Sequence, residues 1–266
     1  MLNTYKRGTE VWVDIDHGTP EEIHEMMNTY NIHPFVAKEL TSATPKPRVE
    51  FHDHYIYCIL HFPVFKHTHS EGASQEIDFI IGQDAIITAR YDTIDALHKF
   101  AKELEVEEIL DKGDSTPKHS HTIFTGLLRG LYISLFEELE YIEDTIEQIT
   151  NKIFKGEEKK MVVSISEITR TLLEFKRVTD LHREILEALR ERGRQIFGDR
   201  FSNEMQAIIL DYQKINTSIK SNLEMLRELR ETDNSLLTAK QTETIKRLSL
   251  VGAILFVISI IVALIQ

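Results

Sequence analysis

The sequence has one cysteine, no proline after Pro117 and no excess of positive charge. The lone Cys58 excludes an internal disulfide, and its position in the apolar run YIYCILHF predicts a buried core thiol. The net charge of −12 argues against nucleic acid as a partner, because phosphate binding needs clustered Lys and Arg. The first residues also lack the apolar run of a secretory signal, so none is expected.

The chain also lacks the patterns that carry covalent chemistry. It has no Gly-rich phosphate loop, and no Ser, Cys or Lys stands in a recognisable pattern with a catalytic base. No His, Cys and acidic residues combine into a metal-hydrolase motif. The sequence therefore predicts that the protein is not an enzyme and that it carries no covalently bound cofactor.

The C-terminal segment lacks charge altogether. After Lys246 and Arg247, no charged residue occurs from Leu248 to Ile265. At about 1.5 Å per residue this helix would be about 27 Å long, close to the bilayer core of about 30 Å. A buried core helix or a helical dimer contact is the alternative. We expect a transmembrane helix at 248–265, with the preceding residues in the cytoplasm because Lys246 and Arg247 flank its entrance.

The first part of the chain, residues 1–117, has the pattern of a mixed α/β domain. Short runs rich in Val, Ile, Tyr and Phe predict strands at 11–15, 54–65, 76–82 and 85–91. A helix is predicted to begin at Pro20, with Thr19 as its N-cap and acidic residues in its first turn. A second amphipathic helix is predicted at 94–105.

Residues 118–247 contain no proline, and their apolar residues recur at three- and four-residue steps. The pattern predicts three long helices in this part: 124–153, a second at 165–189 that ends in the Gly193–Gly198 region, and a third that begins near Ser202. No Gly or Pro interrupts the third helix before Gly252, which favours a long coiled stalk running into the membrane segment. The fold class expected is α+β/α: a mixed α/β domain, a helical stalk and one transmembrane helix.

Polar and small residues form a continuous stripe along the last predicted helix, which we call the seam. Ile215, Ile219, Leu223, Leu226 and Leu229 occupy a different face and are expected to pack on protein. The seam follows alternating steps of three and four residues and comprises Thr217, Ser221, Glu224, Glu228, Glu231, Ser235, Thr238, Thr242, Ile245, Ser249, Gly252, Phe256, Ser259 and Ala263.

Two interpretations of the seam remain open at this point. It is either a solvated outer face that continues as a small-residue helix contact in the membrane, or the lining of a water-filled passage among several copies. In the second interpretation Glu224, Glu228 and Glu231 form an acidic vestibule that attracts cations, and Ile245 and Phe256 form hydrophobic constrictions.

Four segments together resemble the CorA family of divalent-cation transporters, which includes the ZntB zinc transporters. Each segment is a weak motif by itself, but the four segments, in this order and at this spacing, extend over nearly all of the chain. They are WVDIDHGTPEEIHEMMNTYNIHPFVAKEL, TPKPRVEFHDHYIYCILHFP, EIDFIIGQDAIITARYDTIDAL and NSLLTAKQTETIKRLSLVGAILF.

The resemblance implies a funnel of five identical subunits in a cell membrane, with the first membrane span lining the pore. The transported substrate would be Mg²⁺, or Co²⁺, Ni²⁺ or Zn²⁺. Leu248 takes the place that strict stepping along the seam gives to Ser249. The pore-facing positions that the resemblance implies are Thr242, Ile245, Leu248, Gly252, Phe256 and Ser259.

The sequence departs from this family pattern in two places. The family follows its first span with a Gly-Met-Asn loop and a second span, but these 266 residues contain no Gly-Met-Asn. The expectation is either a shortened chain or a paralogue that has lost the ion filter. The family also holds inhibitory metal with an acidic residue about where Lys66 stands.

Histidines offer the only substitute for that acidic residue. His67 and His69 could ligate a softer ion such as Zn²⁺, although exposed loop residues are the alternative. His52 and His54, on either side of Asp53, offer no stronger metal site. A different function also stays open, in which the chain is a non-transporting, single-span membrane scaffold or a partner subunit of complete homologues.

Overall fold

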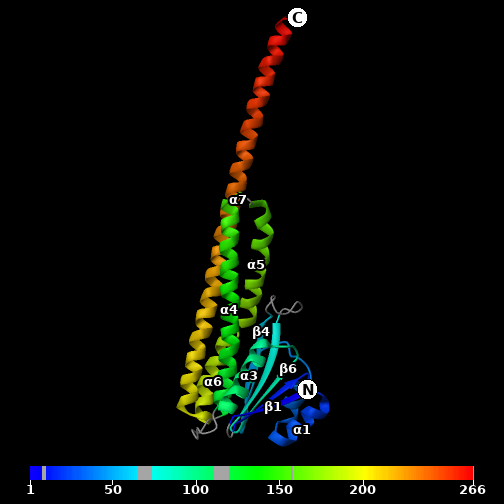
Figure 1. Cartoon of the computed structure of the whole chain (residues 1–266), viewed down its shortest axis with the longest axis vertical. Coiled ribbons are helices and arrows are strands. Elements are labelled where there is room, and N and C mark those ends of the chain that lie inside the picture. The colour runs from blue at the N-terminus through cyan, green and yellow to red at the C-terminus, as the bar shows by residue number, and fades with distance from the viewer. Residues whose placement is uncertain (8–9, 65–73, 111–119, 157, 266) are drawn as a thin grey trace. The chain divides into compact units, whose positions relative to one another are not determined.

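The computed structural model describes residues 1–7, 10–64, 74–110, 120–156 and 158–265 (Figure 1). The chain forms two compact units. The first comprises Met1–Glu140 with Leu173–Ile219, and the second comprises Tyr141–Leu172 with Lys220–Gln266.

A six-stranded mixed sheet organises the first unit. Its strand order is β1-β2-β6-β5-β4-β3; β2 and β6 are parallel and the other neighbours are antiparallel. The predicted mixed sheet is thus confirmed. The strands are β1 (Leu2–Arg7), β2 (Glu10–Asp16), β3 (Arg48–Phe51), β4 (Tyr55–Pro63), β5 (Ser74–Gly82) and β6 (Ala85–Arg90).

Both edge strands, β1 and β3, were missed by the sequence pattern. Their sequences, LNTYKR and RVEF, are short and rich in charge, which suits an edge that must not pair with another chain. The central strands β4 and β5 are buried along nearly their whole length, and these carry the apolar runs that the pattern detected.

Three helices accompany the sheet: α1 (Pro20–Tyr30), α2 (Pro34–Glu39) and α3 (Asp95–Leu110). The predicted start of α1 is confirmed by a capping box, in which the Glu22 amide donates to Thr19 Oγ1 over 3.2 Å and Glu22 Oε2 accepts from the Thr19 amide over 3.0 Å. α1 and α2 cover one face through a core that includes Ile23, Val36 and Leu40. α3 packs beside β1 (Figure 1).

The remainder of the described chain consists of α4 (Ser120–Phe154), α5 (Glu158–Thr179), α6 (His182–Phe197) and α7 (Asp199–Ile265). The prediction of one helix across 165–189 is wrong, because the structure divides it at Asp180 and Leu181. The cause is tertiary: His182 is fully buried, where it bonds to Tyr132 and to the backbone of His61. Neither Gly nor Pro marks this break in the sequence.

The prediction that the Gly193–Gly198 region ends this helix is also only partly right. Gly198 ends α6 with φ of 84°, a conformation that glycine adopts freely. Gly193 instead lies within α6, where a Cβ would come within 2.2 Å of Phe201 Cε1. It is therefore a packing glycine rather than a helix stop.

Cys58 is free and buried as predicted, and burial raises the pKa of its thiol.

Candidate functional site

The acidic part of the seam lies on α7 within the second unit. Glu224, Glu228 and Glu231 are all exposed, whereas Leu226 and Leu229 are buried. The two faces are therefore separated as their spacing predicts. The opposite side of α7 is fixed to its neighbours by hydrogen bonds from Asn222 Nδ2 to Glu143 Oε1 (3.1 Å) and from Arg230 Nη2 to Ser166 Oγ (3.1 Å).

Hydroxyl groups follow the carboxylates along the seam. Ser235, Thr238 and Thr242 are exposed, and each hydroxyl donates to a backbone carbonyl of the preceding turn over 2.9 Å. Each donor is thus satisfied within the helix. An oxygen lone pair remains for a water molecule or a cation, because a hydroxyl accepts two hydrogen bonds as well as donating one.

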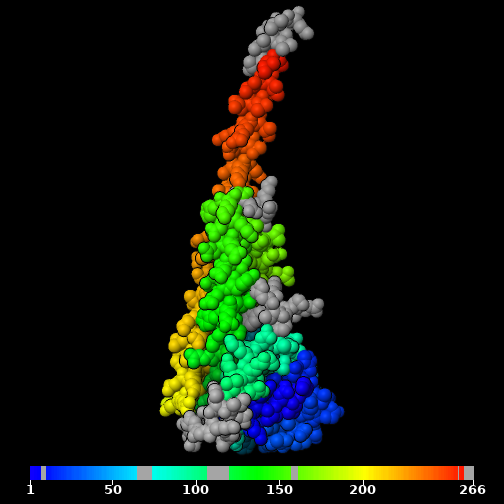
Figure 2. All heavy atoms as spheres, in the orientation of Figure 1, coloured from blue at the N-terminus to red at the C-terminus, as the bar shows by residue number. Residues whose placement is uncertain are grey.

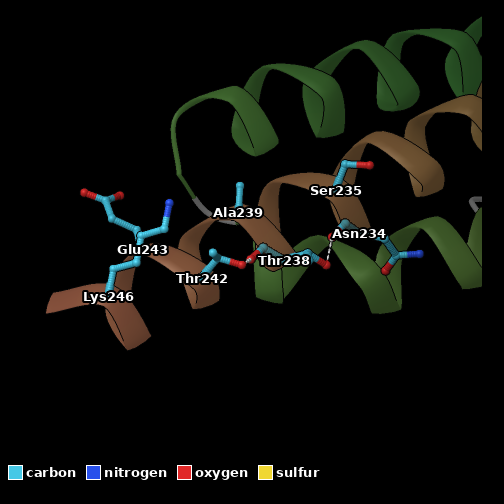
Figure 3. A pocket seen from close by; sticks show the side chains of 7 residues that line it. All are labelled: Asn234, Ser235, Thr238, Ala239, Thr242, Glu243 and Lys246. Carbon is cyan, nitrogen blue, oxygen red and sulfur yellow. Dashed lines mark hydrogen bonds between the residues drawn. The ribbon is translucent and has the colours of Figure 1, made fainter. Parts of the chain in front are cut away.

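A groove runs along this hydroxyl-bearing part of α7, as Figure 3 shows. Most of its lining residues carry a hydroxyl, amide or charged group, although more of the lining surface is apolar than polar. The groove is also wider than the seam, because four of its residues lie one position away from seam positions. It is lined by Asn234, Ser235, Thr238, Ala239, Thr242, Glu243 and Lys246.

The sequence pattern missed Asn234, Ala239 and Glu243 as part of this surface. Each neighbours a seam residue in the sequence, in the pairs Asn234–Ser235, Thr238–Ala239 and Thr242–Glu243. These adjacent pairs of polar or small residues are the signal that a single-residue stripe overlooks. Glu243 accepts from Arg247 Nη2 over 2.7 Å, so its charge is partly balanced.

The upper part of α7 exposes large apolar side chains. Ile245, Leu248 and Phe256 are 62%, 66% and 66% exposed, and Leu250 on another face is 64% exposed. Nothing described lies within 4 Å of a Cβ placed on Gly252. Ser259 Oγ donates to the carbonyl of Phe256 over 2.7 Å. Figure 2 shows this orange-to-red part of α7 uncovered on the side in view. Water alone solvates such a surface poorly.

None of the described helices combines the length and the apolarity that crossing a membrane requires. The side chains of residue 257 and residues 261–265 lie outside the described part of the chain.

The candidate metal ligands His67 and His69 lie outside the described residues. His52 stacks on Tyr55 with 4.5 Å between ring centroids, and its Nε2 lies 3.6 Å from Glu50 Oε2. His54 is exposed. Within the part of the chain that the structure describes, no three His, Cys, Asp or Glu side chains are grouped to hold a metal ion.

Comparison with known proteins matches most of the chain to one family. The family model of the CorA-like Mg²⁺ transporter protein matches residues 8–263. A curated relative, the cobalt/magnesium transport protein CorA of Thermotoga maritima, is 21% identical over 183 residues, which cover 68% of this chain and 51% of the relative. The match therefore spans about half of that relative's length.

Solved structures share the fold. The CorA magnesium transporter of Methanocaldococcus jannaschii aligns with a TM-score of 0.78 at 18% identity, covering 94% of this chain and 77% of the other. The ZntB cytoplasmic domain of Vibrio parahaemolyticus aligns with a TM-score of 0.69 at 15% identity, covering 88% and 90%. With the family model matching nearly every residue, the chain belongs to the CorA-like Mg²⁺ transporter family.

Proposed function

We propose that the chain is a subunit of a divalent-cation transporter, in which several copies of α7 surround the ion path. The observation that carries the proposal is the exposure of the seam from Glu224 to Ser235, opposite buried residues such as Leu226. Membership of a transporter family, rather than of an enzyme family, agrees with this assignment. Five copies is the number that the family resemblance implies.

The proposed path has three layers along α7. Glu224, Glu228 and Glu231 would concentrate cations at its cytoplasmic end by their negative potential. Ser235, Thr238 and Thr242 would replace part of the ion's water contacts with hydroxyl oxygens. Ile245, Leu248 and Phe256 would form narrow apolar rings that close the path by excluding water, with Gly252 and Ser259 as the small positions between and beyond them.

We further propose that residues 248–265 lie in a cell membrane, with residues 1–117 and 118–247 in the cytoplasm. The apolar side chains of α7 are exposed on several faces, and lipid or neighbouring helices would cover them. Lys246 and Arg247 stand where the positive-inside rule places the cytoplasmic border.

The ion is proposed to be Mg²⁺, with Co²⁺, Ni²⁺ and Zn²⁺ as further candidates. Mg²⁺ gives up its water reluctantly, so a path built from carboxylates and hydroxyls would carry it with much of its hydration shell. The curated relative from Thermotoga maritima is described as a cobalt/magnesium transport protein, which supports these two ions first.

Growth rescue of a Mg²⁺-transport-deficient bacterium tests the proposal. Two proteins are compared: the 266-residue chain, and the same chain extended by a Gly-Met-Asn loop and a second span. We expect the extended chain to rescue growth in low Mg²⁺. Failure of both proteins, although both reach the membrane, would contradict transport and favour the scaffold or partner-subunit role.

A further inference from the structure

Two carboxyl side chains are buried side by side on β5 in the first unit, far along the chain from the seam. Glu76 and Asp78 stand two residues apart, so they lie on the same face of the strand. Glu76 is 4% exposed and Asp78 is 0% exposed. Two ionised carboxylates at neighbouring positions on the same face of a buried strand repel each other strongly, because little water screens them. Their protonation therefore needs an explanation.

Glu76 is surrounded by hydrogen-bond donors. Its Oε2 accepts from the Thr44 amide over 2.6 Å and lies 3.0 Å from His61 Nε2, while Oε1 accepts from Thr44 Oγ1 over 3.1 Å. His61 Nε2 also lies 2.9 Å from the carbonyl oxygen of Thr44, so it carries a hydrogen and donates. Donors thus reach both carboxyl oxygens of Glu76. Glu76 thereby holds the segment around Thr44 against the sheet.

Asp78 has the opposite surroundings. Its Oδ2 accepts from Tyr57 Oη over 3.0 Å and from Tyr91 Oη over 3.4 Å. Its Oδ1 is buried, and no donor among the described residues reaches it. Burial first, and then the charge of Glu76, raise the pKa of Asp78 well above its ordinary value. A hydrogen bond with Glu76 also raises this pKa, which is the arrangement expected when Asp78 donates a proton to Glu76.

The nearby cation does not neutralise Asp78. Arg48, on β3, donates to Glu50 Oε1 over 2.8 Å and also to Glu39, at the end of α2. Its guanidinium lies over the Tyr57 ring at 5.7 Å. The ionisable groups described around the pair are thus Glu39 and Glu50 with Arg48 between them, and His61 beside Glu76. The hydrogen bonds to Asp78 come from two tyrosines and not from a cation, so a proton on Asp78 removes its charge.

We propose that Glu76 and Asp78 hold one proton between them, and that this proton keeps the segment around Thr44 fastened to the sheet. Loss of the proton leaves two adjacent buried carboxylates. Glu76 then relieves the repulsion by turning towards water, which breaks both of its bonds to Thr44. The first unit is thereby sensitive to a rise in pH, independently of whether the chain transports ions.

The direction of the effect follows from linkage. The folded state binds one proton more than the unfolded state at any pH between the ordinary pKa of an Asp and the raised pKa of Asp78. In this range the equilibrium constant for folding falls by up to tenfold for each pH unit gained. Ordinary histidines, with a pKa of about 6.5, still lose protons at the lower end of the range above pH 6.5, so the wild type is compared with a variant that keeps every histidine.

The test is urea unfolding of the full chain in detergent at pH 6.5 and pH 8, followed through the first unit's tryptophan, Trp12. We expect the wild-type folding constant to fall over this interval, by at most tenfold for each pH unit, and that of Asp78→Asn to stay nearly constant. Asn keeps the shape and a donor towards Glu76 but cannot ionise. Glu25→Gln, on the exposed side of α1, is the matched control and should keep the wild-type slope. An unchanged slope in Asp78→Asn would overturn the proposal.

A second measurement covers the case in which Asp78→Asn does not fold. Infrared spectra of the wild-type chain at pH 7, with ¹³C-labelled aspartate, should show a protonated carboxyl band that shifts with the label and fades at higher pH. Amide exchange at Thr44 should accelerate over the same pH range by more than its intrinsic increase. Absence of any protonated aspartate band at pH 7 would refute the shared proton.

Discussion

His182 on α6 donates its Nε2 hydrogen to the backbone carbonyl of His61 on β4, over 2.8 Å. A carbonyl only accepts, so Nε2 carries the hydrogen, and Nδ1 accepts from the Tyr132 hydroxyl over 2.8 Å. Both ring nitrogens are thus used in the neutral form. Complete burial lowers the pKa of His182 to about 4. This one residue joins the sheet to the helices of the first unit at the point where α5 and α6 separate.

Acidification should therefore destabilise the first unit through His182. The folded pKa lies below the unfolded value of about 6.5, so its stabilising effect is complete above pH 6.5 and is lost as pH falls towards 4. Between pH 7.5 and pH 5 we expect a loss of about 2 kcal/mol in the free energy of unfolding. His182→Gln should lack this part of the pH dependence, while His24→Gln on the exposed face of α1 should keep it. Equal pH profiles for His182→Gln and the wild type in chemical denaturation would contradict this role.

Gly193→Ala should destabilise the packing of α6 on α7. Its Cβ would lie 2.2 Å from Phe201 Cε1, and Phe201 is fully buried, so the ring cannot move without disturbing the core. We expect a loss of about 1–3 kcal/mol by thermal unfolding. Gly130→Ala in α4 is the matched control, since nothing described lies within 4 Å of its Cβ; it should gain up to about 1 kcal/mol. Similar effects of the two substitutions would show that Phe201 does not set the requirement for glycine.

The sequence pattern predicted the mixed sheet, the start of α1 and the opposite faces of α7, because each rests on local chemistry. Thr19 and Pro20 mark a helix start through their own backbone groups. The separation of Glu228 from Leu229 follows from helical periodicity alone. The family resemblance is confirmed by the family match over residues 8–263.

The errors arose where distant residues decide the structure. The break before His182 depends on β4 and α4, which lie far away in the sequence, and the close approach of Gly193 to Phe201 depends on how α6 meets α7. The pairing of Glu76 with Asp78 was missed because alternation on a strand indicates a shared face but not burial. The width of the groove on α7 was missed because the seam was traced one residue at a time.

The acidic vestibule should control the rate of ion entry. In the chain extended by a Gly-Met-Asn loop and second span, we expect Glu224→Gln, Glu228→Gln and Glu231→Gln together to lower initial Mg²⁺ uptake by roughly tenfold at low ionic strength. The effect should shrink in high salt, which screens the exposed carboxylates. Glu147→Gln, exposed on α4 outside the seam, is the control for general charge loss. Uptake that does not respond to the three substitutions at any salt concentration would remove these carboxylates from the ion path.

The 266-residue chain by itself should not support selective Mg²⁺ uptake. Mg²⁺ needs polar groups in octahedral-compatible positions at the entrance of a path, and the proposed upper lining offers Gly252, Phe256 and Ser259 instead. In the growth test, rescue is expected only from the extended chain. Rescue by the short chain to the same level would disprove this requirement for the added loop.

Cross-linking at position 242 tests the central claim that copies of α7 face one another through the seam. Thr242 and Thr244 are both exposed, and both hydroxyls donate to a backbone carbonyl over 2.9 Å, but they point to opposite sides of the helix. Cys58 is buried, so the introduced cysteine is the accessible thiol in each variant chain. With a short bifunctional maleimide in membranes, Thr242→Cys should give cross-linked dimers and Thr244→Cys only monomers. Cross-linking of Thr244→Cys in preference to Thr242→Cys would contradict the seam as the inner face of the assembly.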